Sequence, residues 1–230
     1  MVKAILFDLD NTLYDQAEYY RLAYDAVADR LVDHCDWSRE RIAKRLFGIW
    51  QEHGSLYGHL FDDILKETKA DDVSVKELVQ VYHDAPVEGL RLYPGIRELL
   101  DMLTGVPVGI ITNGNTTMQK AKVAALGLET YFDVIKYTDA AGRPKPDSYC
   151  YEQSADALGV PSVDCLYVGD NPPIDFPGAR AVGMRTAWLR LGEFANLVES
   201  GDRYADHVAS DVGELRSLVE ECLGGNDDER

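Results

Sequence analysis

The sequence predicts an α/β fold: a doubly wound parallel sheet with an α-helical domain inserted into it. Several short apolar runs end directly in polar residues, which is typical of strands buried on both faces of a parallel sheet. Helical patterns alternate with such runs over residues 94–190, as crossover connections in a parallel sheet require. Residues 15–90, in contrast, show helical patterns only.

Three apolar runs predict strands of this sheet, at residues 4–7, 108–111 and 165–168. The first run stops at Asp8, the second at Thr112 and the third just before Asp170. In open α/β sheets, ligands bind beyond the carboxyl ends of the strands. We therefore expect these three polar residues to lie at one edge of the sheet.

The helices expected between these strands cover residues 94–103, 118–126 and 149–158. In the first, apolar side chains recur at the three- and four-residue spacing of one helix face. The other two are followed by Gly127 and Gly159, the residue type that most often ends a helix.

The inserted segment shows helical patterns over residues 17–31, 38–50 and 60–66, and a further helix is expected after Ser74. Ser74 and Glu77 have the spacing of a capping box. We expect the sheet to resume near Leu92.

These patterns divide the chain into a core domain of residues 1–14 and 91–225 and a helical domain of residues 15–90. The acidic end, residues 226–230, is expected to be a disordered tail.

Composition limits the possible partners. The 230 residues carry 23 Lys and Arg against 40 Asp and Glu, a net charge of −17, which disfavours binding to nucleic acid or an anionic membrane surface. The acidity fits either a surface suited to high salt or plain solubility, and we favour the latter.

The chain has no run of ~18 apolar residues and no signal-peptide pattern, and its four cysteines lack metal-binding spacing. We expect a cytoplasmic protein with reduced thiols, either monomer or homodimer.

The first candidate motif directly follows the first predicted strand and reads Asp8-Leu9-Asp10-Asn11-Thr12. Two carboxylates two residues apart can face one ligand, one as nucleophile and the other as proton donor or acceptor. A solvated turn with aspartates at its ends explains this motif equally well when it is taken alone.

Three further elements have the same ambiguity. Thr112 and Asn113 at a strand-to-helix junction can hold phosphoryl oxygens, or form an ordinary turn. Lys145 stands between two prolines in a stiff segment, or is an exposed loop lysine. Asp170 and Asp175 flank a turn rich in Gly and Pro and suit a hard cation such as Mg²⁺.

In this order and at these spacings, the four motifs resemble those of the haloacid dehalogenase (HAD)-like hydrolase superfamily, in its phosphatase branch. The resemblance extends over nearly the whole chain, from Phe7 to Met184. It implies a Rossmann-like core with a helical cap domain inserted between the first and second motifs, where the helical domain is predicted.

The resemblance also implies roles for individual residues. Asp8 would attack phosphorus and form an aspartyl-phosphate, and Asp10 would protonate the leaving group and then activate water. Thr112 and Asn113 would bind the phosphoryl group, and Lys145 would offset its charge. The implied Mg²⁺ ligands are Asp8, Asp170 and the backbone carbonyl of Asp10. Supporting positions around them are Thr12, Asn171 and Asp175.

The function expected from the resemblance is Mg²⁺-dependent hydrolysis of a small phosphomonoester, such as a sugar phosphate or nucleotide. Dehalogenases lack an acid two residues after the nucleophile, so Asp10 argues against that activity. A phosphomutase, and a binding protein without turnover, remain alternatives.

The cap supplies substrate contacts in this family, and the candidates here are Tyr14, Tyr20, Trp50, His53, Tyr57 and His59. Each could instead be an ordinary structural residue, and Trp50 is expected in the core of the cap.

Overall fold

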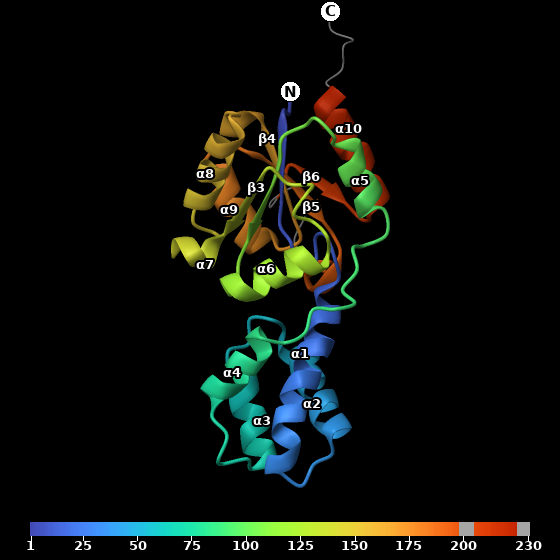
Figure 1. Cartoon of the computed structure of the whole chain (residues 1–230). Helices are drawn as coiled ribbons and strands as arrows, with labels where there is room; N and C mark the ends of the chain where they lie inside the picture. Colours follow the sequence, from blue (N-terminus) through green and yellow to red (C-terminus); the bar gives the residue numbers. More distant parts are fainter. Residues whose placement is uncertain (198–204, 225–230) are drawn as a thin grey trace, which may run out of the picture. The chain divides into compact units, whose positions relative to one another are not determined.

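The computed structural model describes residues 1–197 and 205–224 (Figure 1). The expected tail at residues 226–230 lies outside these ranges. The chain divides into two compact units. The core unit consists of Met1–Asp15 and Arg91–Arg230, and the helical unit consists of Gln16–Leu90.

The core unit is built on a six-stranded parallel sheet with the order β3-β2-β1-β4-β5-β6. Its strands are β1 (Ala4–Phe7), β2 (Val108–Thr112), β3 (Val134–Tyr137), β4 (Cys165–Gly169), β5 (Arg185–Leu189) and β6 (His207–Ala209). Strand β1 lies in the middle, with Phe7 opposite Ile110 on one side and Val168 on the other. The predicted doubly wound parallel sheet is confirmed.

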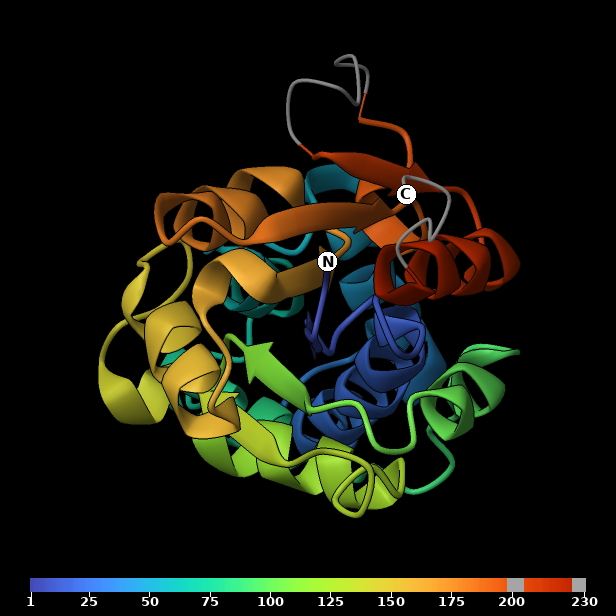
Figure 2. The same ribbon diagram turned by 90° about the horizontal axis from the view of Figure 1, so that it is seen from above.

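Helices cover both faces of this sheet (Figures 1 and 2). They are α5 (Ile96–Met102), α6 (Thr116–Ala125), α7 (Thr138–Ala141), α8 (Tyr149–Leu158), α9 (Pro172–Ala181) and α10 (Val212–Gly224), with short 3₁₀ turns at Ser162–Asp164 and Gly192–Phe194. Helices α8 and α9 pack on each other on one side of the sheet, while α5 and α10 pack together on the other side.

The prediction that the sheet resumes near Leu92 is wrong. Leu92 forms only an isolated antiparallel bridge with Tyr14, and the next strand of the sheet begins at Val108. The intervening segment returns the chain to the core unit, where Tyr93 N donates to the Leu13 carbonyl at 2.9 Å.

Helix α6 begins two residues before the predicted start. The side chain of Asn115 accepts hydrogen bonds from the backbone N–H groups of Thr117 and Met118 at 3.0 and 3.1 Å. It therefore caps the first turn of the helix.

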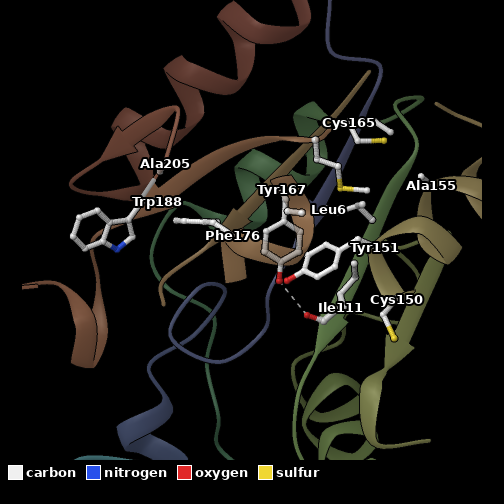
Figure 3. Close-up of a cluster of buried hydrophobic side chains, with 13 residues drawn as sticks. Leu6, Ile111, Cys150, Tyr151, Ala155, Cys165, Tyr167, Phe176, Trp188 and Ala205 are labelled. Atoms are coloured by element: carbon white, nitrogen blue, oxygen red, sulfur yellow. Dashed lines mark hydrogen bonds between the residues drawn. The ribbon is translucent and has the colours of Figure 1, made fainter. Parts of the chain in front are cut away.

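A cluster of buried side chains fills the space between the sheet and helices α8 and α9 (Figure 3). Alternate strand residues supply it, for example Leu6 from β1 and Tyr167 from β4. The Tyr167 hydroxyl is also 3.3 Å from the carbonyl of Ile111. The hydroxyl of Tyr167, a polar group within this apolar cluster, consequently lies near the carboxyl ends of the strands.

The helical unit contains α1 (Gln16–Leu31), a 3₁₀ turn (Val32–His34), α2 (Arg39–His53), α3 (Leu60–Thr68) and α4 (Val75–His83). Half of the predicted capping box forms: Ser74 Oγ accepts from Glu77 N at 3.2 Å. The Glu77 carboxylate binds Arg30 at 2.6 Å instead. Helix α1 packs on both α2 and α4, which explains why its two sides bury apolar residues.

Within the described ranges, no helix is sufficiently long and apolar to cross a bilayer. All four cysteines lie in these ranges and carry free thiols.

Candidate active site

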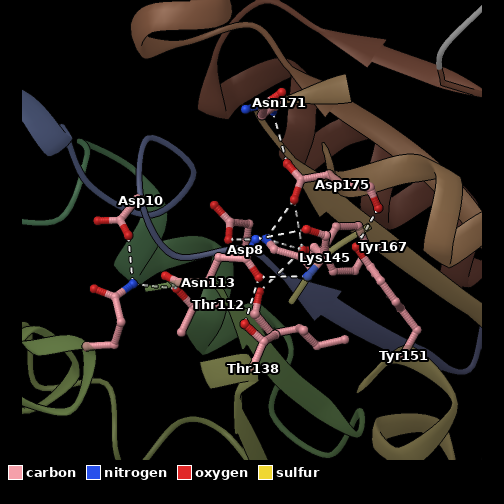
Figure 4. Close-up of polar contacts among 12 residues, drawn as sticks. Asp8, Asp10, Thr112, Asn113, Thr138, Lys145, Tyr151, Tyr167, Asn171 and Asp175 are labelled. Carbon is pink, nitrogen blue, oxygen red and sulfur yellow. Dashed lines mark hydrogen bonds and ion pairs between the residues drawn. The ribbon is translucent and has the colours of Figure 1, made fainter. Parts of the chain in front are cut away.

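The candidate site lies at the carboxyl edge of the sheet (Figure 4). Asp8 directly follows β1, Thr112 is the last residue of β2 and Asp170 directly follows β4. These three strands are neighbours in the sheet, and all three side chains are buried. The alternative of a solvated turn at Asp8 therefore does not hold.

Lys145 is the positive centre of the site. Its Nζ lies 2.5 Å from Asp8 Oδ1, 2.7 Å from Asp175 Oδ1 and 3.1 Å from the Tyr167 hydroxyl. Burial alone would lower the pKa of the lysine, but the carboxylates of Asp175 and Asp8 outweigh it and raise that pKa. Lys145 is therefore a buried, fully charged ammonium and not an exposed loop lysine.

Asn113 fixes the backbone that carries this lysine. Its Oδ1 accepts from Lys145 N at 2.9 Å and from the Thr138 hydroxyl at 2.7 Å. Its Nδ2 donates to the Lys145 carbonyl at 3.1 Å. Both polar atoms of the Asn113 side chain are thus engaged, which leaves its backbone N–H as the group that could face a phosphoryl oxygen.

Three carboxylates surround the lysine and could hold a metal ion. Asp8, Asp170 and Asp175 offer oxygens that all lie within 4.8 Å of one another. Burial, with the neighbouring carboxylates, raises the pKa of Asp8 to about 7 and that of Asp170 well above its usual range. Asp170 Oδ2 is buried and has no hydrogen-bond partner among the residues that the structure describes. The three carboxylates thus outnumber the single ammonium of Lys145, and these hard oxygen ligands fit a divalent cation such as Mg²⁺.

Hydrogen bonds from the surrounding core hold the acids in place. Asn171 N donates to Asp175 Oδ2 at 2.9 Å, and the Tyr151 hydroxyl donates to the Asp175 carbonyl at 2.6 Å. Trp188 Nε1 donates to the Asp170 carbonyl at 2.9 Å. The two aromatic partners were not expected from the sequence, because nothing in the pattern of a buried tyrosine or tryptophan distinguishes one that supports a site.

Asp10 is held apart from this acid cluster by three donors. Lys122 Nζ and Gln119 Nε2 lie 2.7 Å from its Oδ1 and Oδ2, respectively, and the Tyr14 hydroxyl also donates to Oδ1. Burial opposes ionisation of Asp10, but Lys122 outweighs it and holds the pKa of Asp10 below its usual range. Asp10 is therefore a carboxylate in the free protein.

Gln119 and Lys122 were missed by the sequence analysis. Both are fully buried, although polar residues of a helix normally face solvent. Their separation of three residues, which places them on one helix face, is the only signal that could have linked them. Thr12 is two residues after Asp10 in the sequence. Its hydroxyl is buried and has no hydrogen-bond partner in residues 1–197 and 205–224.

The candidate substrate contacts are spread over both units. Tyr14 belongs to the core unit. Tyr20, Trp50 and Tyr57 line a cavity of about 230 Å³ within the helical unit. The residues that line it do not include His53 or His59; the His53 ring stacks on Tyr57 with centroids 4.3 Å apart.

Comparisons with known proteins find relatives over nearly the whole chain. A family model described as haloacid dehalogenase-like hydrolase matches residues 2–183. The glyceraldehyde 3-phosphate phosphatase of Methanocaldococcus jannaschii is 30% identical over 226 residues, which cover 95% of this chain and 97% of that protein. The ribulose-1,5-bisphosphate 5-phosphatase of Halopiger xanaduensis is 30% identical over 238 residues, which cover 95% of this chain and 100% of that protein.

A solved structure with a similar fold is the HAD phosphatase from Thermococcus onnurineus. It is 27% identical with a TM-score of 0.66, and the match covers 95% of this chain and 98% of that one.

Proposed function

The chain belongs to the haloacid dehalogenase-like hydrolases, as its four motifs predicted, and on this premise we propose that it is a phosphatase of a small phosphorylated metabolite. Two relatives of 30% identity are named as phosphatases of a triose phosphate and of a pentose bisphosphate. The proposed chemistry is Mg²⁺-dependent hydrolysis through an aspartyl-phosphate.

The observation that carries this proposal is the surroundings of Asp8. It is a buried carboxylate at the end of the central strand, 2.5 Å from the ammonium of Lys145 and within 4.8 Å of Asp170 and Asp175. A nucleophilic carboxylate must approach a phosphate that repels it, so positive charge has to be close to both. Lys145 supplies one such charge.

A divalent cation would be held by the carboxylates of Asp8 and Asp170 and by the backbone carbonyl of Asp10. When bound, it would neutralise the charge of the phosphoryl oxygens and of the attacking carboxylate. The partnerless oxygen of Asp170 and the raised pKa of Asp8 support this assignment, because a cation favours the ionised form of both acids.

The reaction would proceed in two displacements at phosphorus. An Asp8 oxygen forms a bond to phosphorus while the bond to the leaving oxygen breaks, and that oxygen takes a proton from Asp10. Asp10 then accepts a proton from water, the water oxygen attacks phosphorus, and the bond to Asp8 breaks to release inorganic phosphate.

The first displacement requires a proton on Asp10, which is ionised in the free protein because of Lys122. A bound phosphomonoester brings negative charge close to Asp10, and like charges disfavour the ionised form. Substrate binding would therefore favour uptake of the proton that the leaving group needs.

We propose a small phosphorylated sugar or triose as the substrate, on the basis of the two named relatives. Within the helical unit, the aromatic cavity lined by Tyr20, Trp50 and Tyr57 is a candidate for binding an organic group.

The test is release of inorganic phosphate from a panel of phosphomonoesters that includes glyceraldehyde 3-phosphate, ribulose 1,5-bisphosphate, nucleoside monophosphates and an aryl phosphate. We expect Mg²⁺-dependent release, loss of activity in EDTA and its return with excess Mg²⁺. Isomerised substrate without free phosphate would show a mutase instead. Full activity in EDTA would contradict the metal assignment.

A further inference from the structure

Helix α6 carries two polar side chains that are completely buried in the core unit, Gln119 and Lys122. They are three residues apart and project from one face of the helix. A lysine is almost never fully buried unless it is paired. The groups that these two side chains contact therefore indicate what this face of the helix does.

Together the two side chains hold both carboxylate oxygens of Asp10. Lys122 Nζ is 2.7 Å from Oδ1, and Gln119 Nε2 is 2.7 Å from Oδ2. Hydrogen bonds to a charged group are short, strong and directional. The side chain of Asp10 is consequently restricted to one orientation.

The same amide nitrogen of Gln119 also donates to Thr112 Oγ1, at 2.5 Å. An amide NH₂ group donates two hydrogens and accepts none, so the hydroxyl hydrogen of Thr112 must point elsewhere. Its present acceptor is the carbonyl of Asn113 at 3.3 Å, a long contact. Thr112 therefore keeps a hydrogen that a phosphoryl oxygen could accept.

Asp10 fixes the direction of the Gln119 amide, because the reverse orientation would set an amide oxygen against a carboxylate oxygen. In the observed orientation, Gln119 Oε1 is buried and finds no hydrogen-bond partner within the described part of the chain. An unsatisfied buried acceptor is unfavourable. The contacts to Asp10 and Thr112 are thus made although they leave Gln119 Oε1 buried and unsatisfied, which lowers stability. A role in stability alone therefore does not explain this glutamine.

We propose that Gln119 and Lys122 are positioning residues of the phosphatase reaction. Lys122 and Gln119 hold Asp10 where it exchanges protons with the leaving group and with water. Gln119 also directs the hydroxyl hydrogen of Thr112 toward the phosphoryl group. This inference rests on the proposed function, since it requires a reaction in which Asp10 transfers a proton.

The test of Lys122 compares two substrates that differ in their need for a proton. An alkyl phosphate has a poor leaving group and needs one, whereas 4-nitrophenyl phosphate needs little help. For Lys122→Met, we expect kcat/KM to fall at least ~10-fold more with the alkyl phosphate than with the aryl phosphate. A purely structural role would lower both by the same factor and would overturn the proposal. Lys120→Met, an exposed neighbour on the same helix, is the control and should leave both values unchanged.

A double variant keeps the test valid if Lys122→Met folds poorly. Removing Lys122 alone leaves the Asp10 carboxylate buried without its cation, whereas Asp10→Asn/Lys122→Met removes both charges. If Lys122 acts through Asp10, the double variant should match Asp10→Asn in kcat/KM within about 2-fold. If Lys122→Met lowers kcat/KM by as much in the Asp10→Asn background as in the wild-type background, the proposal is overturned.

Gln119→Glu and Gln119→Met separate the two roles of the glutamine. Both remove the amide that donates to Thr112, but only glutamate has an oxygen that can accept the Thr112 hydrogen and withdraw it from the phosphoryl group. We expect KM for the alkyl phosphate to rise at least ~10-fold more in the glutamate variant. Equal KM values would overturn the role assigned at Thr112. If the unaltered protein releases no phosphate from either ester, the proposed function itself fails, and this inference with it.

Discussion

At the scale of single residues, two aspartates only two positions apart have opposite surroundings. Asp8 lies among carboxylates, and burial raises its pKa to about 7 despite Lys145. Burial acts on Asp10 in the same direction, but Lys122 keeps the pKa of Asp10 low. These opposite surroundings are consistent with the proposed roles, in which Asp8 binds the cation and Asp10 exchanges a proton.

Substitution of each aspartate should give a different defect. Asp8→Asn removes the proposed nucleophile, so turnover should fall by several orders of magnitude. Asp10→Asn should still form the phosphoenzyme from an activated aryl phosphate, but hydrolyse it ~10²–10⁴-fold more slowly. Mass spectrometry of the quenched Asp10→Asn enzyme should therefore find a phosphoryl group on the peptide that contains Asp8. A phosphoryl group on another residue would contradict the assignment.

The raised pKa of Asp8 should also appear in the stability of the metal-free protein. The pKa is about 7 in the folded chain against an ordinary value of 3.8, so the folded state binds more protons between these two pH values. This contribution to stability is complete below the unfolded pKa and is lost as the pH rises through the folded one.

Asp8→Asn does not titrate and serves as the reference. Between pH 5 and 8 in EDTA, the free energy of unfolding of the wild type should fall by roughly 3 kcal/mol relative to Asp8→Asn. Denaturant titrations at several pH values measure this difference. A difference that is constant over this range would show that Asp8 has an ordinary pKa.

At the scale of elements, helix α9 packs directly against the segment that carries Lys145. A Cβ atom at Gly178 would lie 2.5 Å from the Pro146 carbonyl oxygen and 2.6 Å from the Tyr151 ring. Pro146 follows Lys145, so a shift of Pro146 that relieves this clash also moves the lysine.

Gly178→Ala should consequently lower both stability and turnover. We expect a loss of ~1–3 kcal/mol from overpacking, measured by chemical denaturation, together with reduced kcat. Gly224→Ala is the matched control, because its Cβ, at the end of α10, would meet no atom of the described residues within 4 Å. If Gly178→Ala has the stability and kcat of the wild type, then helix α9 and the segment that contains Pro146 can move apart at no cost in stability or turnover.

The cap of helix α4 gives a second test at this scale. Ser74→Ala removes the acceptor for Glu77 N and should destabilise the helical unit by ~1 kcal/mol, whereas Ser74→Asp keeps a capping oxygen. Thermal unfolding followed by circular dichroism distinguishes them. Equal melting temperatures would show that the cap contributes nothing.

The strands that were predicted from the sequence are those that are buried along their whole length. Every residue of β1, β2 and β4 is buried, so each appears in the sequence as a continuous apolar run. Strand β3, in contrast, is half-buried at the edge of the sheet and includes a lysine. The sheet was wrongly expected to resume near Leu92, which forms a single isolated bridge. In sequence, an isolated bridge and the end of a strand show the same local pattern.

At the scale of the whole molecule, the order of motifs along the chain predicted which strand ends meet, because a doubly wound sheet brings them to one edge. Asp8, Thr112 and Asp170 could be placed in this way. The contacts of Gln119 and Lys122 to Asp10 could not, since they depend on how α6 packs on the sheet and not on any local pattern.

The net charge of −17 predicts how stability depends on salt. Repulsion among surface carboxylates disfavours the compact state, and salt screens it, since the Debye length falls from ~30 Å at 0.01 M to ~3 Å at 1 M. At pH 7.5 we expect the melting temperature to rise by a few degrees up to ~0.5 M NaCl and then to level off. Near the isoelectric point of about 4.6, the rise should vanish. Melting curves at both pH values measure this effect. A melting temperature that continues to rise in KCl at several molar would instead favour a surface adapted to high salt, because screening alone is already complete there.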